Sequence, residues 1–202
     1  MHSLRNAAIL TLVIAVVGPA QASAFAEGPI SAIRRTNTTL NKLLRKETAK
    51  PASKRIQKRL KATVGAFLDF EELARRALGK HWEKRTASER AEFVSVLANL
   101  IENNYVKQMR GNLDYKLKYN GERVKGSQAR VETSVIVEKD GRVQEVEISY
   151  KMRKTRRGWM VYDVITDDVS VVRNYRSQFN RIIRRNSYEH LLKKMRSKAE
   201  KI

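Results

Sequence analysis

Asp163 is the residue of this sequence whose setting could support catalysis. It lies in the predicted strand 159–165. Three apolar side chains share its face of that strand: Trp159, Val161 and Ile165. A carboxylate on a buried apolar face could act as a general base in a pocket. It could instead be structural, accepting hydrogen bonds from backbone or pairing with an arginine such as Arg176, and we favour this role because a buried acid usually has a partner.

The three histidines form neither a catalytic nor a metal-binding pattern. His2 lies in an N-terminal segment that we expect to be removed. His81 follows a predicted helix end, where an imidazole interacts with the helix carboxyl end or packs on Trp82. His190 lies on the exposed side of a predicted C-terminal helix. The chain has no Cys, no histidine pair at ligand spacing and no glycine-rich phosphate loop, so we predict no metal, no cofactor and no enzymatic activity.

Residues 1–26 have the pattern of a secretory signal peptide. Arg5 precedes an uncharged apolar run, Ala7–Val17, and overlapping A-x-A segments follow, the last of which ends at Ala26. The run is shorter than the roughly 20 residues that a membrane span needs. We expect cleavage after Ala26, export in soluble form and, in a double-membrane bacterium, a periplasmic location. The absence of Cys excludes a lipid anchor on the new N-terminus.

The chain is strongly basic, with a formal net charge of +21 and an isoelectric point near 10.5. Such a charge usually suggests nucleic acid, but an exported protein meets little of it, so we predict no nucleic-acid partner. Anionic membrane surfaces fit better, because basic side chains near them are attracted individually. Residues 27–202 are long enough for one domain with a sizeable core, and without Cys that domain must hold by packing alone.

The elements that must position these residues occur in the order helices, strands, helices: 27–111 is mainly helical, 112–167 forms a sheet and 168–202 forms C-terminal helices. Pro51 separates the first two helices. Asp69, with Glu72 three residues later, is typical of a helix start.

Other helix ends carry similar signals. Gly79 suits the left-handed residue that follows a helix. A second capping box, Thr86 with Glu89, opens a long helix that should end near Gly111, and Ser170 should cap the helix after the sheet.

Apolar and polar residues alternate over 113–119, 131–137 and 146–152, as expected for strands with one buried face. Turn signals separate these runs and a fourth strand at 159–165: Asn120-Gly121, Asp140-Gly141 and Arg157-Gly158. The fold class is therefore α+β: a curved antiparallel or mixed sheet of at least four strands, covered by N- and C-terminal helices. A strongly curved sheet wrapped by helices forms a cone, whose interior is either filled by side chains or encloses an apolar ligand.

Four segments carry a resemblance to a known family: 67–70 (FLDF), 77–82 (ALGKHW), 159–164 (WMVYDV) and 169–179 (VSVVRNYRSQF), with Phe93 and Tyr105 between them. In this order and spacing, the chain resembles the MlaC family of periplasmic phospholipid-binding proteins, also called the toluene-tolerance auxiliary family. The resemblance runs from about residue 30 to 194. The extent of positive charge and the long basic tail depart from the family pattern.

The resemblance implies a fold similar to nuclear transport factor domains, with acyl chains in an apolar cavity between sheet and helices. It implies a carrier that moves glycerophospholipid between the outer and inner membranes and maintains outer-membrane lipid asymmetry. The implied partners are an outer-membrane lipoprotein complex and an inner-membrane ABC transporter with a lipid-binding periplasmic ring. Phospholipid is then cargo rather than cofactor, and we expect a monomer.

A carrier of this kind needs an apolar interior, because about 30 lipid methylenes at about 0.8 kcal/mol each cost about 24 kcal/mol to move through water. Ten inward-facing residues could line it: Phe93, Leu97, Ile101, Tyr105, Val135, Ile148, Tyr150, Val161, Tyr175 and Phe179. Each could equally be ordinary core. Two other functions stay open, namely an enzyme that uses the cone with Asp163 as base, and a basic module that binds polyanions or membrane surfaces around a filled core.

Overall fold

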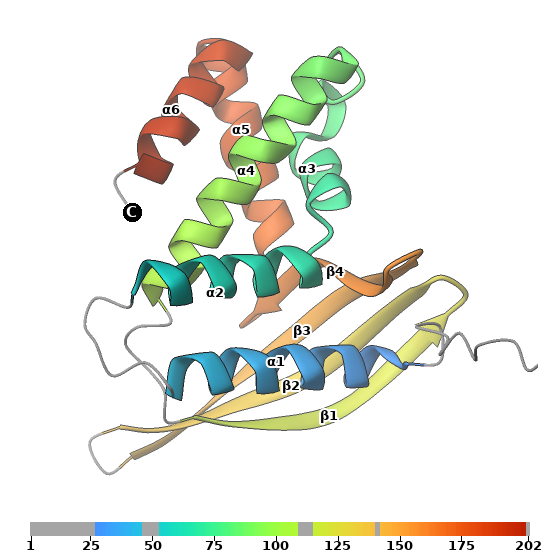
Figure 1. Cartoon of the computed structure of the whole chain (residues 1–202). Helices are drawn as coiled ribbons and strands as arrows, with labels where there is room; N and C mark the ends of the chain where they lie inside the picture. The colour runs from blue at the N-terminus through green and yellow to red at the C-terminus, as the bar shows by residue number, and fades with distance from the viewer. Residues whose placement is uncertain (1–26, 46–52, 109–114, 140–141, 201–202) are drawn as a thin grey trace, which may run out of the picture.

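The computed structural model describes residues 27–45, 53–108, 115–139 and 142–200 (Figure 1). The helices in these ranges are α1 (Pro29–Arg45), α2 (Lys54–Phe67), α3 (Phe70–Leu78), a short 3-10 helix η1 (Gly79–His81), α4 (Ala87–Gln108), α5 (Val171–Arg185) and α6 (Tyr188–Glu200). The strands lie between α4 and α5, which confirms the predicted α+β class. The expected signal peptide, Pro51, Gly111 and the Asp140-Gly141 turn lie outside the described residues.

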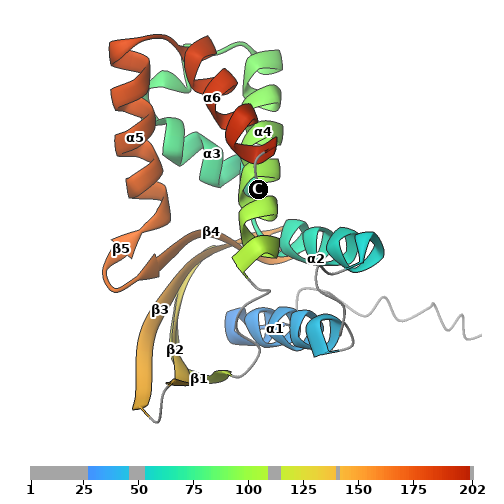
Figure 2. The ribbon, with the colours of Figure 1, turned by 90° about the vertical axis from the view of Figure 1, so that its left-hand side faces the viewer.

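The sheet is an antiparallel meander in which each strand pairs with its neighbour in sequence. Its strands are β1 (Tyr115–Lys125), β2 (Gln128–Lys139), β3 (Arg142–Thr155), β4 (Gly158–Thr166) and β5 (Val169–Ser170). The sheet curves, and α1 lies within the curve with α2 beside it (Figures 1 and 2). The helices α3 to α6 form a lobe next to β4, so the molecule has a sheet half and a helical half.

One predicted turn is wrong. Strand β1 continues through Asn120 and Gly121, where the pairing with β2 shifts register, and the chain reverses only at Gly126. The Asn120 amide donates a hydrogen bond to Ser134 Oγ (2.8 Å), which holds this irregular segment against β2. Gly126 has φ +58°, a left-handed conformation that glycine adopts without strain. The Asn-Gly pair therefore marks a β-bulge, a feature that bends a strand.

The predicted capping box of α4 is confirmed. The Thr86 N–H donates to Glu89 Oε2 (2.7 Å), and the Glu89 N–H donates to Thr86 Oγ1 (3.2 Å). The predicted cap of α5 is also confirmed, because the Arg173 N–H donates to Ser170 Oγ (3.0 Å). These bonds satisfy N–H groups that have no partner within the helix.

Asp69 caps α3 as predicted, but the reciprocal bond of the predicted capping box, from the Asp69 N–H to the Glu72 carboxylate, is not formed. Its Oδ1 accepts from the Glu72 N–H (3.1 Å), whereas the Glu72 carboxylate turns to the guanidinium groups of Arg75 and Arg76. The Asp69 N–H instead donates to the Val161 carbonyl of β4 (2.8 Å), and its other carboxylate oxygen pairs with Arg153 of β3. The start of α3 is thus fixed to the sheet.

The hydrophobic core is divided in two. One cluster lies within the helical lobe and includes Phe93, Leu97 and Phe179. The other packs α1 and α2 against the sheet and includes Leu60 and Val161. The C-terminal helix α6 packs on α4 and α5, so it completes the helical lobe rather than covering the face of the sheet.

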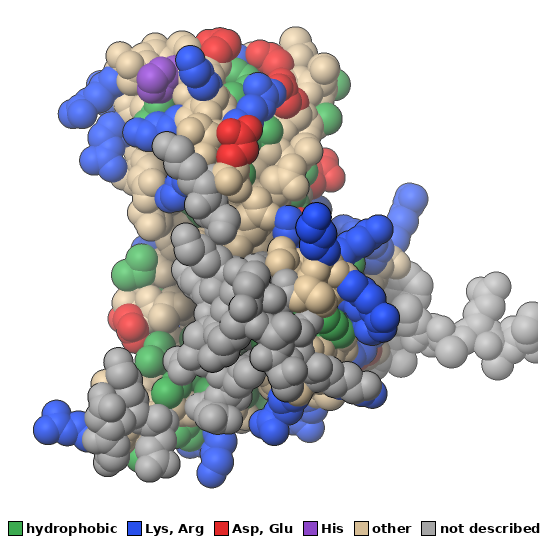
Figure 3. Space-filling view, turned by 60° about the vertical axis from the view of Figure 1, so that its left-hand side comes forward, with side chains coloured by type: hydrophobic (Ala, Val, Ile, Leu, Met, Phe, Trp, Pro, Cys, Tyr) green, Lys and Arg blue, Asp and Glu red, His purple; other side chains and the backbone are tan. Residues whose placement is uncertain are grey.

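Basic side chains are spread over the surface, as the composition requires (Figure 3). Within the ranges that the structure describes, no helix combines the length and the hydropathy that crossing a bilayer demands.

We predict that Asp69→Ala lowers the free energy of unfolding by about 1–3 kcal/mol, because it removes the α3 cap and the buried partner of Arg153. Asp69→Asn should cost less, since the amide oxygen still accepts from Glu72 and only the charge toward Arg153 is lost. Urea unfolding followed by circular dichroism measures both. Equal losses for the two variants would show that the cap contributes nothing.

Candidate functional site

A pocket of about 520 Å³ lies between the curved sheet and the helices α1, α2 and α4. Its volume falls in the range of small-molecule sites, roughly 300–1,000 Å³. Most of the lining is apolar, and its polar members are Thr36, Asn37 and Asp163. The pocket therefore offers hydrocarbon contact over most of its surface and few groups that could orient a polar ligand.

Six of the ten residues predicted to line a cavity do line this pocket: Ile101, Tyr105, Val135, Ile148, Tyr150 and Val161. Ile101 and Tyr105 come from the C-terminal part of α4, and the other four come from β2, β3 and β4. In the register of β2 and β3, Val135 lies opposite Val146 and Ile148 lies opposite Thr133. Because every second side chain of a strand points to the same face, this register gathers the strand residues on the concave side.

The other four predicted residues lie elsewhere. Phe93 and Leu97 are fully buried in the helical lobe, and Tyr175 and Phe179 pack there beside them. The Phe93 ring meets the Phe179 ring edge-on at 5.7 Å between centroids, and Tyr175 stacks on Phe179 at 5.2 Å. The physical reason is the length of α4: the helix has 22 residues, and its first half packs within the helical lobe while only its second half joins the cluster on the sheet.

Several lining residues were not among those predicted. They share positions on the apolar sides of elements that the sequence did indicate: Ile33, Leu40, Val64, Phe67, Tyr115, Leu117 and Val137. The helical periodicity of α1 and α2 and the alternation of β1 and β2 mark these residues as inward-facing. Periodicity does not show which inward-facing side chains meet a neighbour and which border an open space.

The tyrosines of the pocket are kept neutral. Burial raises the pKa of Tyr105 above its ordinary value, and burial raises the pKa of Tyr150 to about 12 despite an opposing hydrogen bond with Thr133. Burial also raises the pKa of Tyr115, whose hydroxyl lies 2.8 Å from Asn37 Oδ1 and 3.0 Å from Asn41 Oδ1. At neutral pH these side chains present rings and uncharged hydroxyls to a ligand.

Asp163 lines the pocket but is held in a structural network. Its Oδ1 accepts from the Val172 N–H (3.1 Å), the Ser170 hydroxyl lies 3.0 and 2.8 Å from its two oxygens, and Lys151 Nζ lies at 3.8 Å from Oδ2. The carboxylate thus ties β4 to the first turn of α5, which confirms the structural role. Arg176 was the wrong partner, because its Nε donates to the Arg76 carbonyl (2.8 Å).

The comparisons with known proteins begin with a family model described as MlaC protein, which matches residues 34–197. The chain belongs to the MlaC family. The resemblance found in the sequence segments is thereby confirmed.

A curated relative in this family is the intermembrane phospholipid transport system binding protein MlaC of Haemophilus influenzae. It is 22% identical over 135 residues, which make up 66% of this chain and 63% of the relative. The chain therefore spans less than two thirds of the length of that relative.

A solved structure has the same fold: the phospholipid-binding protein from Ralstonia solanacearum in complex with a phospholipid. The two superpose with a TM-score of 0.71 at 16% sequence identity, over 84% of this chain and 96% of the other. At this identity the likeness concerns the fold.

The segment 77–82 (ALGKHW), one of the four that resemble the family, contains His81, whose role the structure explains. His81 Nε2 lies 3.0 Å from Asn180 Oδ1, so the imidazole links η1 to α5. This partner on α5 was not among the contacts predicted for His81. Trp82 has the Arg90 guanidinium over its ring (5.3 Å). His190 is exposed on α6 as predicted. No group of three or more His, Asp or Glu that could hold a metal occurs in the described ranges.

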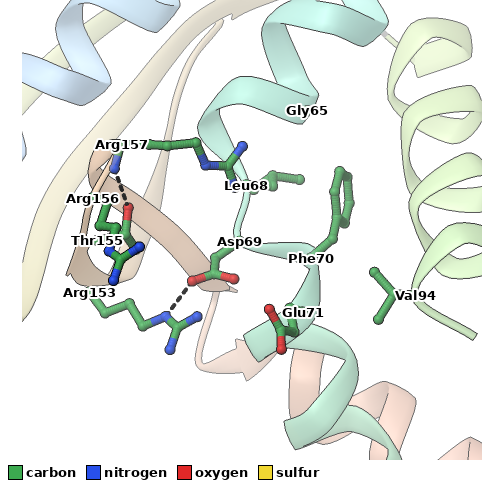
Figure 4. Close-up of a pocket in the computed structure, with 10 residues that line it drawn as sticks. All are labelled: Gly65, Leu68, Asp69, Phe70, Glu71, Val94, Arg153, Thr155, Arg156 and Arg157. Carbon is green, nitrogen blue, oxygen red and sulfur yellow. Dashed lines mark hydrogen bonds and ion pairs between the residues drawn. The ribbon is translucent and has the colours of Figure 1, made fainter. Parts of the chain in front are cut away.

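A second hollow, of about 390 Å³, lies where the junction of α2 and α3 meets the hairpin of β3 and β4 (Figure 4). Leu68 lines both this hollow and the apolar pocket. In Figure 4 the Arg153 side chain reaches the Asp69 carboxylate, and the Arg157 N–H donates to Thr155 Oγ1 (3.0 Å). The Arg153 contact braces the α2–α3 junction, whereas the Arg157 bond lies within the turn between β3 and β4. Half of the ten lining residues of this hollow are charged, in contrast to the apolar pocket.

We predict that Asp163→Asn destabilises the fold by about 1–3 kcal/mol, because the amide offers one acceptor where the carboxylate offers two. The midpoint of urea unfolding measures the loss. Asp167→Asn is the matched control: Asp167 is exposed and has φ +47°, a conformation that Asn tolerates. Equal midpoints for the two variants would contradict the structural role of Asp163.

Proposed function

We propose that this protein is a periplasmic phospholipid carrier that holds acyl chains in the apolar pocket. In this proposal it moves glycerophospholipids between the outer and inner membranes and helps to maintain the lipid asymmetry of the outer membrane. The observation that carries it is the pocket of about 520 Å³ bounded by the sheet, α1 and α2, in a chain of the MlaC family.

The pocket supports the proposal energetically. A carrier has to offset about 24 kcal/mol for roughly 30 methylenes, and only a largely apolar lining can do so. Water in a hollow with this lining finds few hydrogen-bond partners, so an apolar ligand can replace it at little cost. A bound hydrocarbon chain also gains dispersion contacts with the lining.

The lining also supports a carrier in preference to an enzyme. Among the described residues, Asp163 is the one carboxylate in the pocket lining, and it is engaged by Ser170 and Val172. The tyrosine hydroxyls are neutral at physiological pH. A wall of aliphatic and aromatic groups distinguishes weakly between acyl chains, since one methylene more or less changes binding by only about 1–3 kcal/mol. We therefore propose broad acceptance of acyl chains and no catalysis.

Membership of the family supports a proposal for the partners. We propose that an outer-membrane lipoprotein complex and an inner-membrane ABC transporter with a lipid-binding ring exchange lipid with this carrier, which acts as a monomer. The sequence pattern of residues 1–26 supports export by a cleaved signal peptide, and the name of the Haemophilus relative supports work between membranes. Direction of transport requires different affinities at the two docking sites.

We predict that the purified protein carries phospholipid. Organic extraction followed by mass spectrometry should detect diacyl glycerophospholipids with mixed chain lengths, at a reproducible ratio of lipid to protein. Repeated lipid-free preparations that also take up no lipid from vesicles would overturn the carrier function.

We predict that filling the pocket displaces the lipid. Val135→Trp and Ile148→Trp place a large ring where acyl chains should lie, so bound lipid should fall several-fold while the circular dichroism spectrum is retained. Val143→Trp is the matched control, because Val143 lies on β3 with 70% of its surface exposed. Lipid content that is the same in all three variants would remove this pocket as the lipid site.

A further inference from the structure

The exposed face of α2 is purely basic apart from two alanines. Its exposed positions are Lys54, Arg55, Lys58, Arg59, Ala62 and Ala66. The helix contains no Asp or Glu, and its remaining basic residue, Lys61, is half-buried and lies within electrostatic range of Glu102 on α4. We refer to Lys54, Arg55, Lys58 and Arg59 as the α2 patch.

The α2 patch opposes the stability of its own helix. The N-terminal end of a helix carries a partial positive charge, so acidic residues stabilise the first turn and basic residues destabilise it. The first turn of α2 has no acidic residue, and the patch occupies its first two turns. The two cations of the first turn, Lys54 and Arg55, are therefore not explained by helix stability.

The α2 patch is also free of ion pairs within the described ranges. Other basic residues of the helical half are paired with acids, among them Arg75, Arg85 and Arg90. In the parts of the chain that the structure describes, no ion pair joins any member of the patch. Its charges are solvated and available to an external anion.

The α2 patch lies on the outer side of a pocket wall. Leu60 and Val64 are buried on the opposite side of the helix, and Val64 and Phe67 line the apolar pocket. In Figure 3, Lys and Arg side chains gather on the side of the molecule where Figure 2 shows α2. A surface that contacts the patch is therefore separated from the pocket by the thickness of one helix.

We infer that the α2 patch docks the protein on the anionic surface of a phospholipid bilayer, with α2 lying against the head groups. This inference rests on the proposed function for its purpose, because docking through α2 brings the lipid pocket to the membrane. Docking by charge requires no cargo, however, and so the two can be tested separately.

The composition of the face favours a bilayer over an acidic protein. A protein interface has a buried centre rich in aromatic and other apolar side chains, whereas the exposed positions of α2 offer only Lys, Arg and Ala. Flexible cations without an apolar anchor match a fluid layer of phosphate head groups, to which each basic side chain near the surface adds about fivefold in affinity.

The experiment measures co-sedimentation of the purified protein with vesicles of 30% phosphatidylglycerol in phosphatidylcholine, and with vesicles of phosphatidylcholine alone. We expect binding to the anionic vesicles that weakens steeply between about 50 mM and 500 mM salt, since salt screens exposed charges. The variant K54Q/R55Q/K58Q/R59Q should bind roughly 600-fold more weakly, which is about fivefold for each of the four charges removed. Its melting temperature should be no lower than that of the unmodified protein, because the substitutions relieve the helix end.

The matched control is R181Q/R184Q/R185Q/K193Q, which removes four exposed positive charges from α5 and α6. It should retain vesicle binding within about threefold, as expected if position rather than net charge decides. Equal losses in the two variants, or no binding of the unmodified protein to anionic vesicles, would overturn the docking and point to an acidic protein surface as the partner. Lipid extracted from the same preparations tests the carrier function independently.

Discussion

The fixing of two chain segments to β4 is the interaction on which the rest of the structure depends. At Val161 the strand accepts the Asp69 N–H and pairs with Leu68, so the junction of α2 and α3 cannot leave the sheet. At Asp163 it holds the first turn of α5 through Ser170 and Val172. Both acids are almost fully buried, and buried acids are tolerated only with such partners. The helical half is thereby attached at one strand.

This attachment leaves the concave face of the sheet mainly to α1 and α2, with the C-terminal part of α4 at its edge. The six α-helices that the structure describes could have packed with the sheet into one solid core, but α3 to α6 form a separate core around Phe93 and Phe179. The two remaining helices do not fill the curve of the sheet, and the pocket is the space that is left. An apolar pocket of this kind suits a cargo that is held by buried apolar surface rather than by hydrogen bonds or ion pairs.

The basic residues of the described helices also fall into two groups, those that are paired with acids and those that are not. Basic residues of α3 and α4 are largely neutralised by neighbouring acids, as at Glu72 and Glu89. The four residues of the α2 patch form no ion pair within the described ranges, although α2 is one of the helices that border the pocket. The pocket wall that is apolar inside is thus cationic outside. This arrangement would let one element serve both the cargo and the surface that supplies it.

The sequence by itself determined the local features. Hydrophobic periods of 3.6 and 2 located the helices and strands and their order gave the fold class. Capping residues set the starts of α4 and α5, and four segments identified the family. These signals are local because they depend on a residue and its neighbours along one element. The turn predicted at Asn120-Gly121 was wrong because the signal is local: a turn and a β-bulge use the same residue types.

Only the tertiary structure decided which apolar residues border the pocket. Phe93 and Tyr105 lie on one stripe of one helix, yet the first is enclosed by α5 and α6 and the second faces the sheet. The partners of Asp163 and His81 also lie on other elements. An inward-facing side chain has the same periodicity whether a neighbour fills the space before it or not. The difference depends on how distant segments pack, because packing and not periodicity determines where volume is left empty.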